Sequence, residues 1–385
     1  MKRNFFKLGL MTALVAVAMT VTSCKDENED SFNDEQASLV AAQFVDHTVV
    51  PTYTELAAKT ELLATQLATL KSNPTDANLQ AACETFLDAR AWWEMSEAFL
   101  FGAAGDFGID PHIDSWPLDV NAFNTLMNSP SMIASLDGED GDEVAGNNLG
   151  NALLGFHGIE YILFANGQPK QASSLSENEL IYVVAVAGDL RNRCFQLEVS
   201  WNGDKAPQSH IDKLDALELP YTVASGIQSY GDNMKNAGKA GSTYSSRIVA
   251  LMAIVDGCRS IADEVGSSKI GAPHTGEDVN YIESPYSQKS IIDFYNNILS
   301  IKNAYMGGIE GQRDDSRSLH RFVKDNDSDL DARMVAAIDN AMAKIDAMPK
   351  PFVQNYTSSA CAEAMEACAQ VDELFAEIND MLSKL

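Results

Sequence analysis

Hydrophobic residues recur at helical spacing along almost the whole chain of 385 residues. One long amphipathic stretch covers residues 34–70 and contains Pro51. Because proline removes a backbone donor and clashes with the preceding helical turn, we expect a kink or a break near residues 47–51. Val and Ile do not alternate with polar residues over the length of a strand, so we expect no sheet.

The same spacing predicts further helices over residues 76–101, 120–127, 148–165, 177–201, 221–237, 243–265, 288–308, 328–347 and 355–384. Helices of these lengths with short polar connections predict an all-α fold of two packed helical bundles. The polar stretch 202–207 marks the expected boundary, with an N-terminal bundle over 34–202 and a C-terminal bundle over 208–385. Between the helices, residues 107–116 and the acidic run 137–143 are expected to be irregular.

The first residues have the pattern of an export signal. Three basic residues precede an apolar stretch, 8–21, that is too short to span a bilayer comfortably. The next residues end in Val-Thr-Ser-Cys24, which resembles the lipobox of bacterial lipoproteins, where cleavage precedes a cysteine that then carries the lipid. The alternative is an ordinary signal peptide followed by a chance cysteine.

We therefore predict a signal peptide over 1–23, lipidation of Cys24 and an acidic tether over 24–33. The protein is then expected in the cell envelope, held to the membrane only through its N-terminal lipid. The formal net charge of −28 argues against nucleic acid as a partner, because phosphate binding needs clustered Lys and Arg. It is compatible with binding of cations. The five remaining cysteines are odd in number and lack a C-x-x-C spacing, so a disulfide framework is not expected.

Candidate chemistry lies on the predicted helix 148–165, which carries His157 and Glu160. Residues three apart share a helix face, and both belong to an otherwise apolar stripe with Leu153 and Phe164. Both side chains should therefore point inward, where they need partners because unpaired burial costs several kcal/mol. Either they satisfy each other as structural groups, or they contribute to a binding site.

Four segments together resemble the imelysin-like family. The helix contains the family's G-x-H-x-x-E segment, from Gly155 to Glu160, followed by Tyr-Ile-Leu-Phe. Residues 90–102, with two glutamates and a pair of tryptophans, are similar to another family segment. Residues 49–53 fit its first helix, and residues 284–293 fit its S-x-Y-S…S…D segment. The resemblance covers nearly the whole chain after Cys24.

This resemblance implies a two-domain helical-bundle fold and a link to iron or another transition metal. The family was first catalogued as peptidases, and its relatives include the periplasmic component of ferrous-iron uptake systems and iron-regulated envelope proteins. A family name is not a mechanism, so the individual residues have to be weighed.

Imidazole and carboxylate groups suit Fe or Zn²⁺, but two ligands do not make a site. Glu97 is the candidate for a third ligand, because it falls on the inward stripe of its own helix and the family's segment carries a glutamate there. A structural ion pair between Glu97 and Arg90 is the equal alternative. Glu94 is expected on the flank of that helix.

Other residues are candidates for binding a ligand near the same site. Asp114 follows the glutamate helix closely and can reach the same space, although a structural role is favoured. Ser287 is well placed to cap a helix that begins at Gln288, and Asp293 can compensate that helix's dipole. The resemblance adds the alternative that Ser287 and Asp293 face a cleft between the bundles.

A peptidase activity has less support. The zinc-protease motif H-E-x-x-H is absent, and the inverted form would need histidine where Tyr161 stands. His210, His274 and His320 occur in polar contexts and are expected on the surface. We therefore expect an envelope lipoprotein that binds or senses a transition metal, or a small ligand carrying one, between the bundles. The alternatives are a metallopeptidase using His157 and Glu160, and a partner-binding surface lipoprotein whose polar pair is structural.

Overall fold

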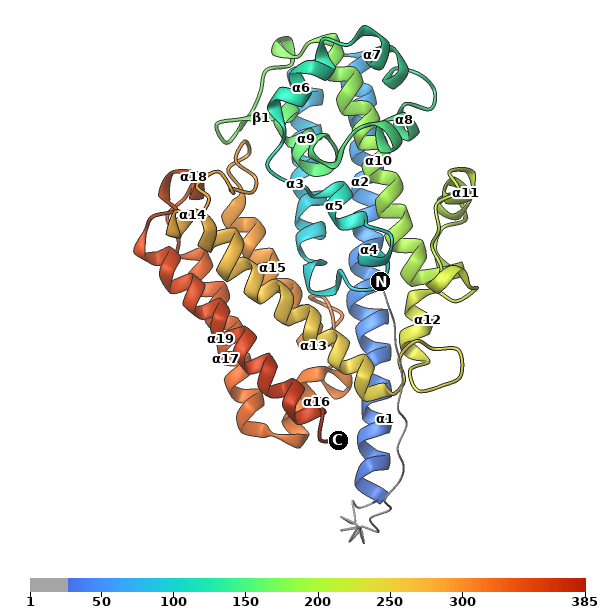
Figure 1. Ribbon diagram of the computed structural model, residues 1–385, viewed down its shortest axis with the longest axis vertical. Helices are drawn as coiled ribbons and strands as arrows, with labels where there is room; N and C mark the ends of the chain where they lie inside the picture. The colour runs from blue at the N-terminus through green and yellow to red at the C-terminus, as the bar shows by residue number, and fades with distance from the viewer. Residues whose placement is uncertain (1–26) are drawn as a thin grey trace, which may run out of the picture.

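The computed structural model describes residues 27–385, which are almost entirely helical (Figure 1). Three long helices pack together as the first bundle: α2 (Val50–Ser72), α3 (Asp76–Glu94) and α10 (Glu177–Asn202). Four helices form the second bundle: α13 (Arg247–Asp263), α15 (Ser290–Tyr305), α17 (Ser328–Asp346) and α19 (Ser359–Leu382). The predicted all-α fold of two packed bundles is confirmed. The predicted signal peptide and Cys24 lie outside the described residues.

Short elements connect the long helices. In the first half of the chain they are α4 (Ala103–Asp106), α5 (Ile109–Ile113), α6 (Val120–Met127), α7 (Pro130–Leu136), α8 (Gly141–Asn148) and α9 (Gly155–Leu163). A hairpin of two-residue strands, β1 (Phe164–Ala165) and β2 (Gln168–Pro169), follows α9. In the second half they are α11 (Gln208–Ala216), α12 (Tyr230–Lys235), α14 (Gly271–Thr275), α16 (Leu319–Asn326) and α18 (Phe352–Asn355).

The predicted break near Pro51 is a π-helical turn. Helix α1 (Glu27–Phe44) runs through this turn, Val45–Val49, into α2 without leaving the helical conformation. Pro51 has no N–H to give to the carbonyl of His47, and that carbonyl instead accepts a hydrogen bond of 2.9 Å from the backbone of Ile309. The proline thus joins the first long rod of helix to the second half of the chain.

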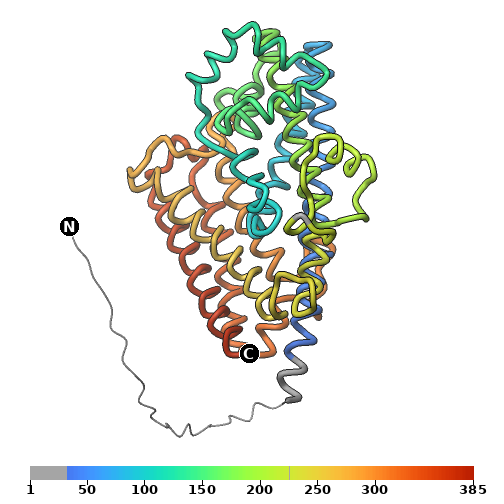
Figure 2. The backbone as a smooth tube through the Cα atoms, turned by 45° about the vertical axis from the view of Figure 1, so that its right-hand side comes forward, coloured from blue at the N-terminus to red at the C-terminus, as the bar shows by residue number. Residues whose placement is uncertain are grey.

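The two bundles touch along their length. Helix α1 packs against α13, and α3 packs against α15. Two views show the second bundle on one side of the blue rod formed by α1 and α2, with its gold helix α13 nearer to α1 and its red helix α19 farther away (Figures 1 and 2). α1 begins at Glu27, so the last part of the expected tether is helical. Because both bundles share these contacts, the boundary at residues 202–207 stays a prediction.

Several helices are shorter than their hydrophobic patterns indicated. The helix expected over 76–101 ends at Glu94, where the Ser96 hydroxyl donates to the carbonyl of Trp93 at 2.7 Å and competes with the helical pattern. The helix expected over 148–165 is reduced to α9, and that over 221–237 to α12. The segments 107–116 and 137–143 were expected to be irregular, but α5 and the start of α8 lie in them.

Residues 27–385 include no helix with both the length and the apolar composition that crossing a membrane requires. The five cysteines in this range are unpaired, and each is buried among apolar side chains. They serve as small hydrophobic residues of the core.

Candidate functional site

A cluster of ionisable side chains is buried where the first bundle meets the second. Its members come from α3 and the turn after it, the end of α5, α9, α15 and the segment between α13 and α15, and none is more than 6% exposed. We call it the polar cluster, and its residues are Arg90, Glu94, Glu97, Asp114, His157, Glu160, Lys269, Glu283 and Asp293. Six carboxyl groups thus face two permanent cations and one histidine.

Arg90 is at the centre of the polar cluster. Its Nη2 lies 2.5 Å from Glu94 Oε1 and 2.5 Å from Glu283 Oε1, while its Nη1 pairs with Asp114. The other oxygen of Asp114 accepts a hydrogen bond of 2.7 Å from the indole of Trp93. One guanidinium therefore links the first bundle to Glu283 of the second half. Its planar group presents several N–H donors in fixed directions, so it can bind several carboxylates at once.

Lys269 is the second buried cation. Its Nζ lies 3.2 Å from Glu283, 3.8 Å from Glu94 and 3.9 Å from Glu97. It belongs to a π-helical segment, Glu264–Ile270, that continues α13, and such wider turns are frequent at functional sites. Only 1% of the side chain is exposed, so its charge depends on these carboxylates.

The glycine of the G-x-H-x-x-E segment sets the position of His157. Gly155 has φ +64, and a Cβ at this position would lie 1.8 Å from the carbonyl oxygen of Ile113. The start of α9 can therefore approach the end of α5 only because this residue is glycine. That approach places His157 Nε2 3.0 Å from Asp114 Oδ1, an ion-pair contact without the alignment of a hydrogen bond.

Glu160 connects α9 to the second half of the chain. Its Oε1 accepts hydrogen bonds from the backbone N–H groups of Ser287, at 2.7 Å, and Tyr286, at 3.2 Å. Its Oε2 lies 3.8 Å from His157 Nδ1 and has no hydrogen-bond partner among the described residues. Glu160 thus orients the histidine and holds the segment that contains Glu283.

Burial and the crowding of carboxyl groups raise the pKa values of several of them. Burial raises the pKa of Glu94 to about 7, although Arg90 acts against it, and burial together with Glu94 raises the pKa of Asp293 to about 7. Burial also raises the pKa values of Glu97 and Glu283. Burial is the largest cause of these shifts, and neighbouring carboxyl groups of the polar cluster add to it.

Asp114 and His157 shift in the opposite sense. Burial alone would raise the pKa of Asp114, but Arg90 and His157 hold it well below its usual range. Burial alone would lower the pKa of His157, but the carboxylates of Asp114 and Glu160 raise it to about 9. The pair is therefore charged at neutral pH unless a cation replaces the histidine proton.

Two sets of three donors are close enough to hold a metal ion. Asp114, His157 and Glu283 offer ligand atoms within 4.8 Å of one another, as do Glu94, Glu97 and Asp114. The first set combines a nitrogen with two carboxylates, a composition suited to Fe or Zn²⁺. Glu283 Oε2 is buried and makes no hydrogen bond with described residues, and His157 Nε2 faces Asp114, so a cation that replaces the histidine proton would meet all three residues.

The predicted ligand set is therefore revised. The structure brings His157 together with Asp114 and Glu283, whereas Glu97 lies with Glu94 and Lys269. The alternative ion pair between Glu97 and Arg90 is wrong, because Arg90 pairs with Glu94, Asp114 and Glu283. Glu94, expected on the flank of its helix, is fully buried.

The second-bundle candidates also differ from expectation. α15 begins at Ser290, so Ser287 does not cap it, and the Ser287 N–H binds Glu160 instead. Asp293 lies buried in the polar cluster. His210, expected on the surface, is 7% exposed and contacts Glu198.

Sequence reasoning missed Glu283 and gave no role to Lys269. Both occur near the family-like segment 284–293, but neither falls on a helical stripe, because Glu283 lies in a loop and Lys269 in the π-helical segment. The available signal was their proximity to that segment.

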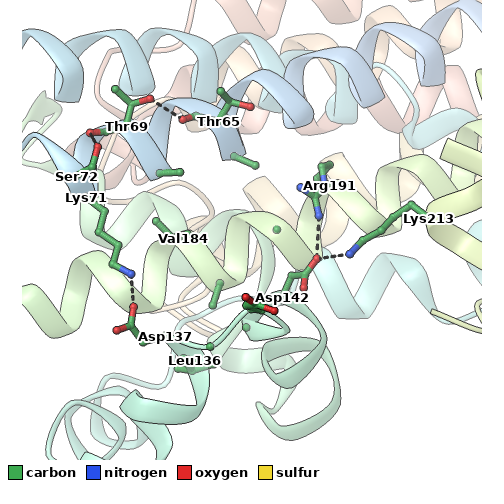
Figure 3. A pocket seen from close by; sticks show the side chains of 17 residues that line it. Thr65, Thr69, Lys71, Ser72, Leu136, Asp137, Asp142, Val184, Arg191 and Lys213 are labelled. Atoms are coloured by element: carbon green, nitrogen blue, oxygen red, sulfur yellow. Dashed lines mark hydrogen bonds and ion pairs between the residues drawn. The ribbon is translucent and has the colours of Figure 1, made fainter. Parts of the chain in front are cut away.

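Three pockets show where solvent can reach residues between the helices. The largest, of about 720 Å³, lies between α2, α10 and the α7–α8 connection (Figure 3). Its charges compensate each other, since Lys71 pairs with Asp137, and Arg191 and Lys213 both pair with Asp142. A second pocket, of about 410 Å³, lies between the bundles, and His157 is the member of the polar cluster that lines it. A third, of about 380 Å³, reaches Glu97 from another side.

Comparison with known proteins agrees with this architecture. The profile of the Imelysin family matches residues 49–381. Iron-regulated protein A of Synechococcus elongatus is 29% identical over 318 residues, covering 82% of this chain and 77% of that protein. The crystal structure of a putative iron-regulated protein A precursor from Parabacteroides distasonis has a TM-score of 0.77 and 29% identity, and the match covers 91% of this chain and 95% of that one.

An imelysin-like protein from Psychrobacter arcticum shares the fold, with a TM-score of 0.65 at 16% identity over 91% of this chain and 96% of that one. The resemblance inferred from four short segments is confirmed by the family match, which extends over most of the sequence. This chain belongs to the imelysin family.

Proposed function

We propose that this protein binds a transition metal ion at Asp114, His157 and Glu283, with iron as the leading candidate and zinc as the other. The observation that carries this proposal is the convergence of three buried donors within 4.8 Å, two of which keep an atom without a hydrogen-bond partner. An apolar environment makes such free polar atoms costly, and a cation would satisfy them.

The charge of the polar cluster supports the same proposal. Six buried carboxyl groups exceed the charge of Arg90, Lys269 and a protonated His157, and several carry raised pKa values. A divalent or trivalent cation would lower this repulsion, while the two permanent cations hold Asp114 and Glu283 in place. Iron is favoured over zinc because a relative and a structural neighbour are named iron-regulated protein A.

Metal titration of two histidine variants tests the site. Calorimetry with Zn²⁺ and with anaerobic Fe²⁺ should give one site per chain in the wild type, and His157→Ala should weaken it by roughly a hundredfold. His210→Ala is the matched control, because His210 is also buried beside a glutamate but makes no contact with the polar cluster. Weak binding that is equal in all three proteins would leave only the acidic surface as a metal binder and would reject the site.

We also propose that the protein is anchored in the cell envelope by a lipid on Cys24. The basic start, the short apolar stretch and the Val-Thr-Ser-Cys ending support this location. Metabolic labelling with a fatty acid should mark the wild type and should not mark Cys24→Ser. Equal labelling of the two proteins would remove the lipid anchor from the proposal.

A further inference from the structure

The pocket that reaches His157 is lined mainly by apolar and aromatic side chains. It has a volume of about 410 Å³ and lies between residues 116–118 of the first half of the chain and residues 279–286 and 353–356 of the second. Apart from His157 and the aromatic residues, Asn280 is the polar side chain that lines the pocket. Its size falls within the range of small-molecule sites.

Aromatic rings flank the histidine in this pocket. The Trp116 ring centroid lies 5.6 Å from that of His157 and 5.0 Å from that of Tyr281, and Lys269 Nζ lies 5.2 Å from the Trp116 centroid. Tyr286 and Tyr356 also line the pocket. Trp116 lines the pocket, and its Nε1 is buried and has no hydrogen-bond partner among the described residues.

These walls favour one form of the metal over another, although a hydrated ion can still bind the three donors. A hydrated ion held by Asp114, His157 and Glu283 would keep water on its open side, and that water would face proline, leucine, isoleucine and aromatic rings. Such walls cannot replace the hydrogen bonds of a hydration shell. An organic chelator would instead place oxygen donors on the metal and carbon against the walls, which removes apolar surface from water.

We propose that the metal enters this site as a chelate with a small aromatic oxygen-donor ligand of the catecholate type, whose ring occupies the pocket beside Trp116. This inference rests on the proposed metal site and names the form of its substrate. The ring would stack with Trp116 and its neighbours, as aromatic pairs do at centroid distances of about 4.5–7 Å. The indole N–H of Trp116 would donate to a chelator oxygen.

Binding of three probes to the full chain tests the inference. The probes are Zn²⁺ alone, ferric citrate, and ferric 2,3-dihydroxybenzoate at equimolar ratio, followed by calorimetry and by quenching of tryptophan fluorescence. The aromatic complex should bind about tenfold or more tightly than ferric citrate, because citrate supplies oxygen donors without a ring. 2,3-Dihydroxybenzoate without metal should bind much more weakly than its ferric complex.

Two valine variants separate the pocket from the metal donors. Val353→Trp fills the pocket and should abolish the preference for the aromatic complex while Zn²⁺ still binds. Val249→Trp, at an exposed position on α13 that does not line the pocket, should behave as the wild type.

The outcomes distinguish this inference from the metal site itself. If Zn²⁺ binds one site that depends on His157, but both ferric complexes bind equally, the chelate is rejected and the metal site stands. Equal weakening of all probes by Val353→Trp, or equal binding of the ring with and without iron, also rejects the chelate. If no probe binds stoichiometrically, both proposals fail.

Discussion

Two buried histidines of this protein contact carboxylates, and the regions around them differ in what remains unsatisfied. His210 places Nδ1 2.6 Å from Glu198, stacks on Phe195 with ring centroids 3.6 Å apart, and has Glu61 3.9 Å from its other nitrogen. His157 also faces carboxylates, but its Nε2 lacks a hydrogen bond. The residue also lines a pocket.

The two regions differ in charge as well. One buried glutamate, Glu198, faces the imidazole of His210, whereas six carboxyl groups crowd around two cations and a histidine in the polar cluster. A buried histidine–carboxylate pair therefore does not by itself indicate a binding site. Free donor atoms, surplus charge and an opening to solvent separate the functional candidate from the structural pair.

The largest expected effect concerns the glycine that brings α9 against α5. Gly155→Ala should lower the free energy of unfolding by more than about 3 kcal/mol, because its Cβ would overlap the carbonyl of Ile113 at a positive φ. Gly150→Ala is the control: this residue has φ −75 and open space around its Cβ, so the change should stay within about 0.5 kcal/mol. Chemical denaturation measures both, and a similar small effect in the two variants would show that the position of His157 does not depend on Gly155.

The second effect is the pH dependence of the free energy of unfolding, which should arise from the polar cluster. The pKa values of Asp293 and Glu94, about 7, and of His157, about 9, lie above the usual 3.8, 4.5 and 6.5. Each group binds its proton more tightly in the folded state, so its stabilisation is complete below the usual pKa and is lost as pH rises through the folded pKa. Without metal, the free energy of unfolding should therefore fall as the pH rises between about pH 4 and pH 9.

Denaturation in the presence of a chelator at successive pH values measures this slope. Asp293→Asn should flatten the part between about pH 4 and pH 7, since the amide does not titrate. His210→Ala should leave the slope in place. Stability that rises with pH over this range would contradict the charge surplus on which the comparison rests.

The smallest effect is expected at Glu160. Glu160→Gln keeps an oxygen that accepts the backbone N–H groups of Tyr286 and Ser287, so the loss of stability should be about 1–2 kcal/mol. We expect no chelator-sensitive cleavage of unfolded polypeptides in either protein, because Glu160 is engaged with the backbone and the sequence lacks the H-E-x-x-H motif of zinc proteases. A cleavage that disappears in Glu160→Gln, with the circular dichroism unchanged, would promote the metallopeptidase alternative.

The sequence by itself determined the fold class, a distortion of the helix before Pro51 and the burial of His157 and Glu160. Each follows from local physics: helical spacing of apolar residues, the missing N–H of proline, and a stripe that has to face the core.

Tertiary structure alone decided the membership of the site. Extending the stripe of α3 past Glu94 selected Glu97, but the helix ends at Glu94 and the periodicity no longer applies. Both glutamates are buried, and Glu97 lies beside Lys269 rather than beside His157. Glu283 and Lys269 come from a loop and a π-helical turn more than a hundred residues after His157, where no local pattern reports which side chains turn inward. Packing of the two bundles brings these groups together, because contact between distant segments is a property of the folded chain and not of the spacing along it.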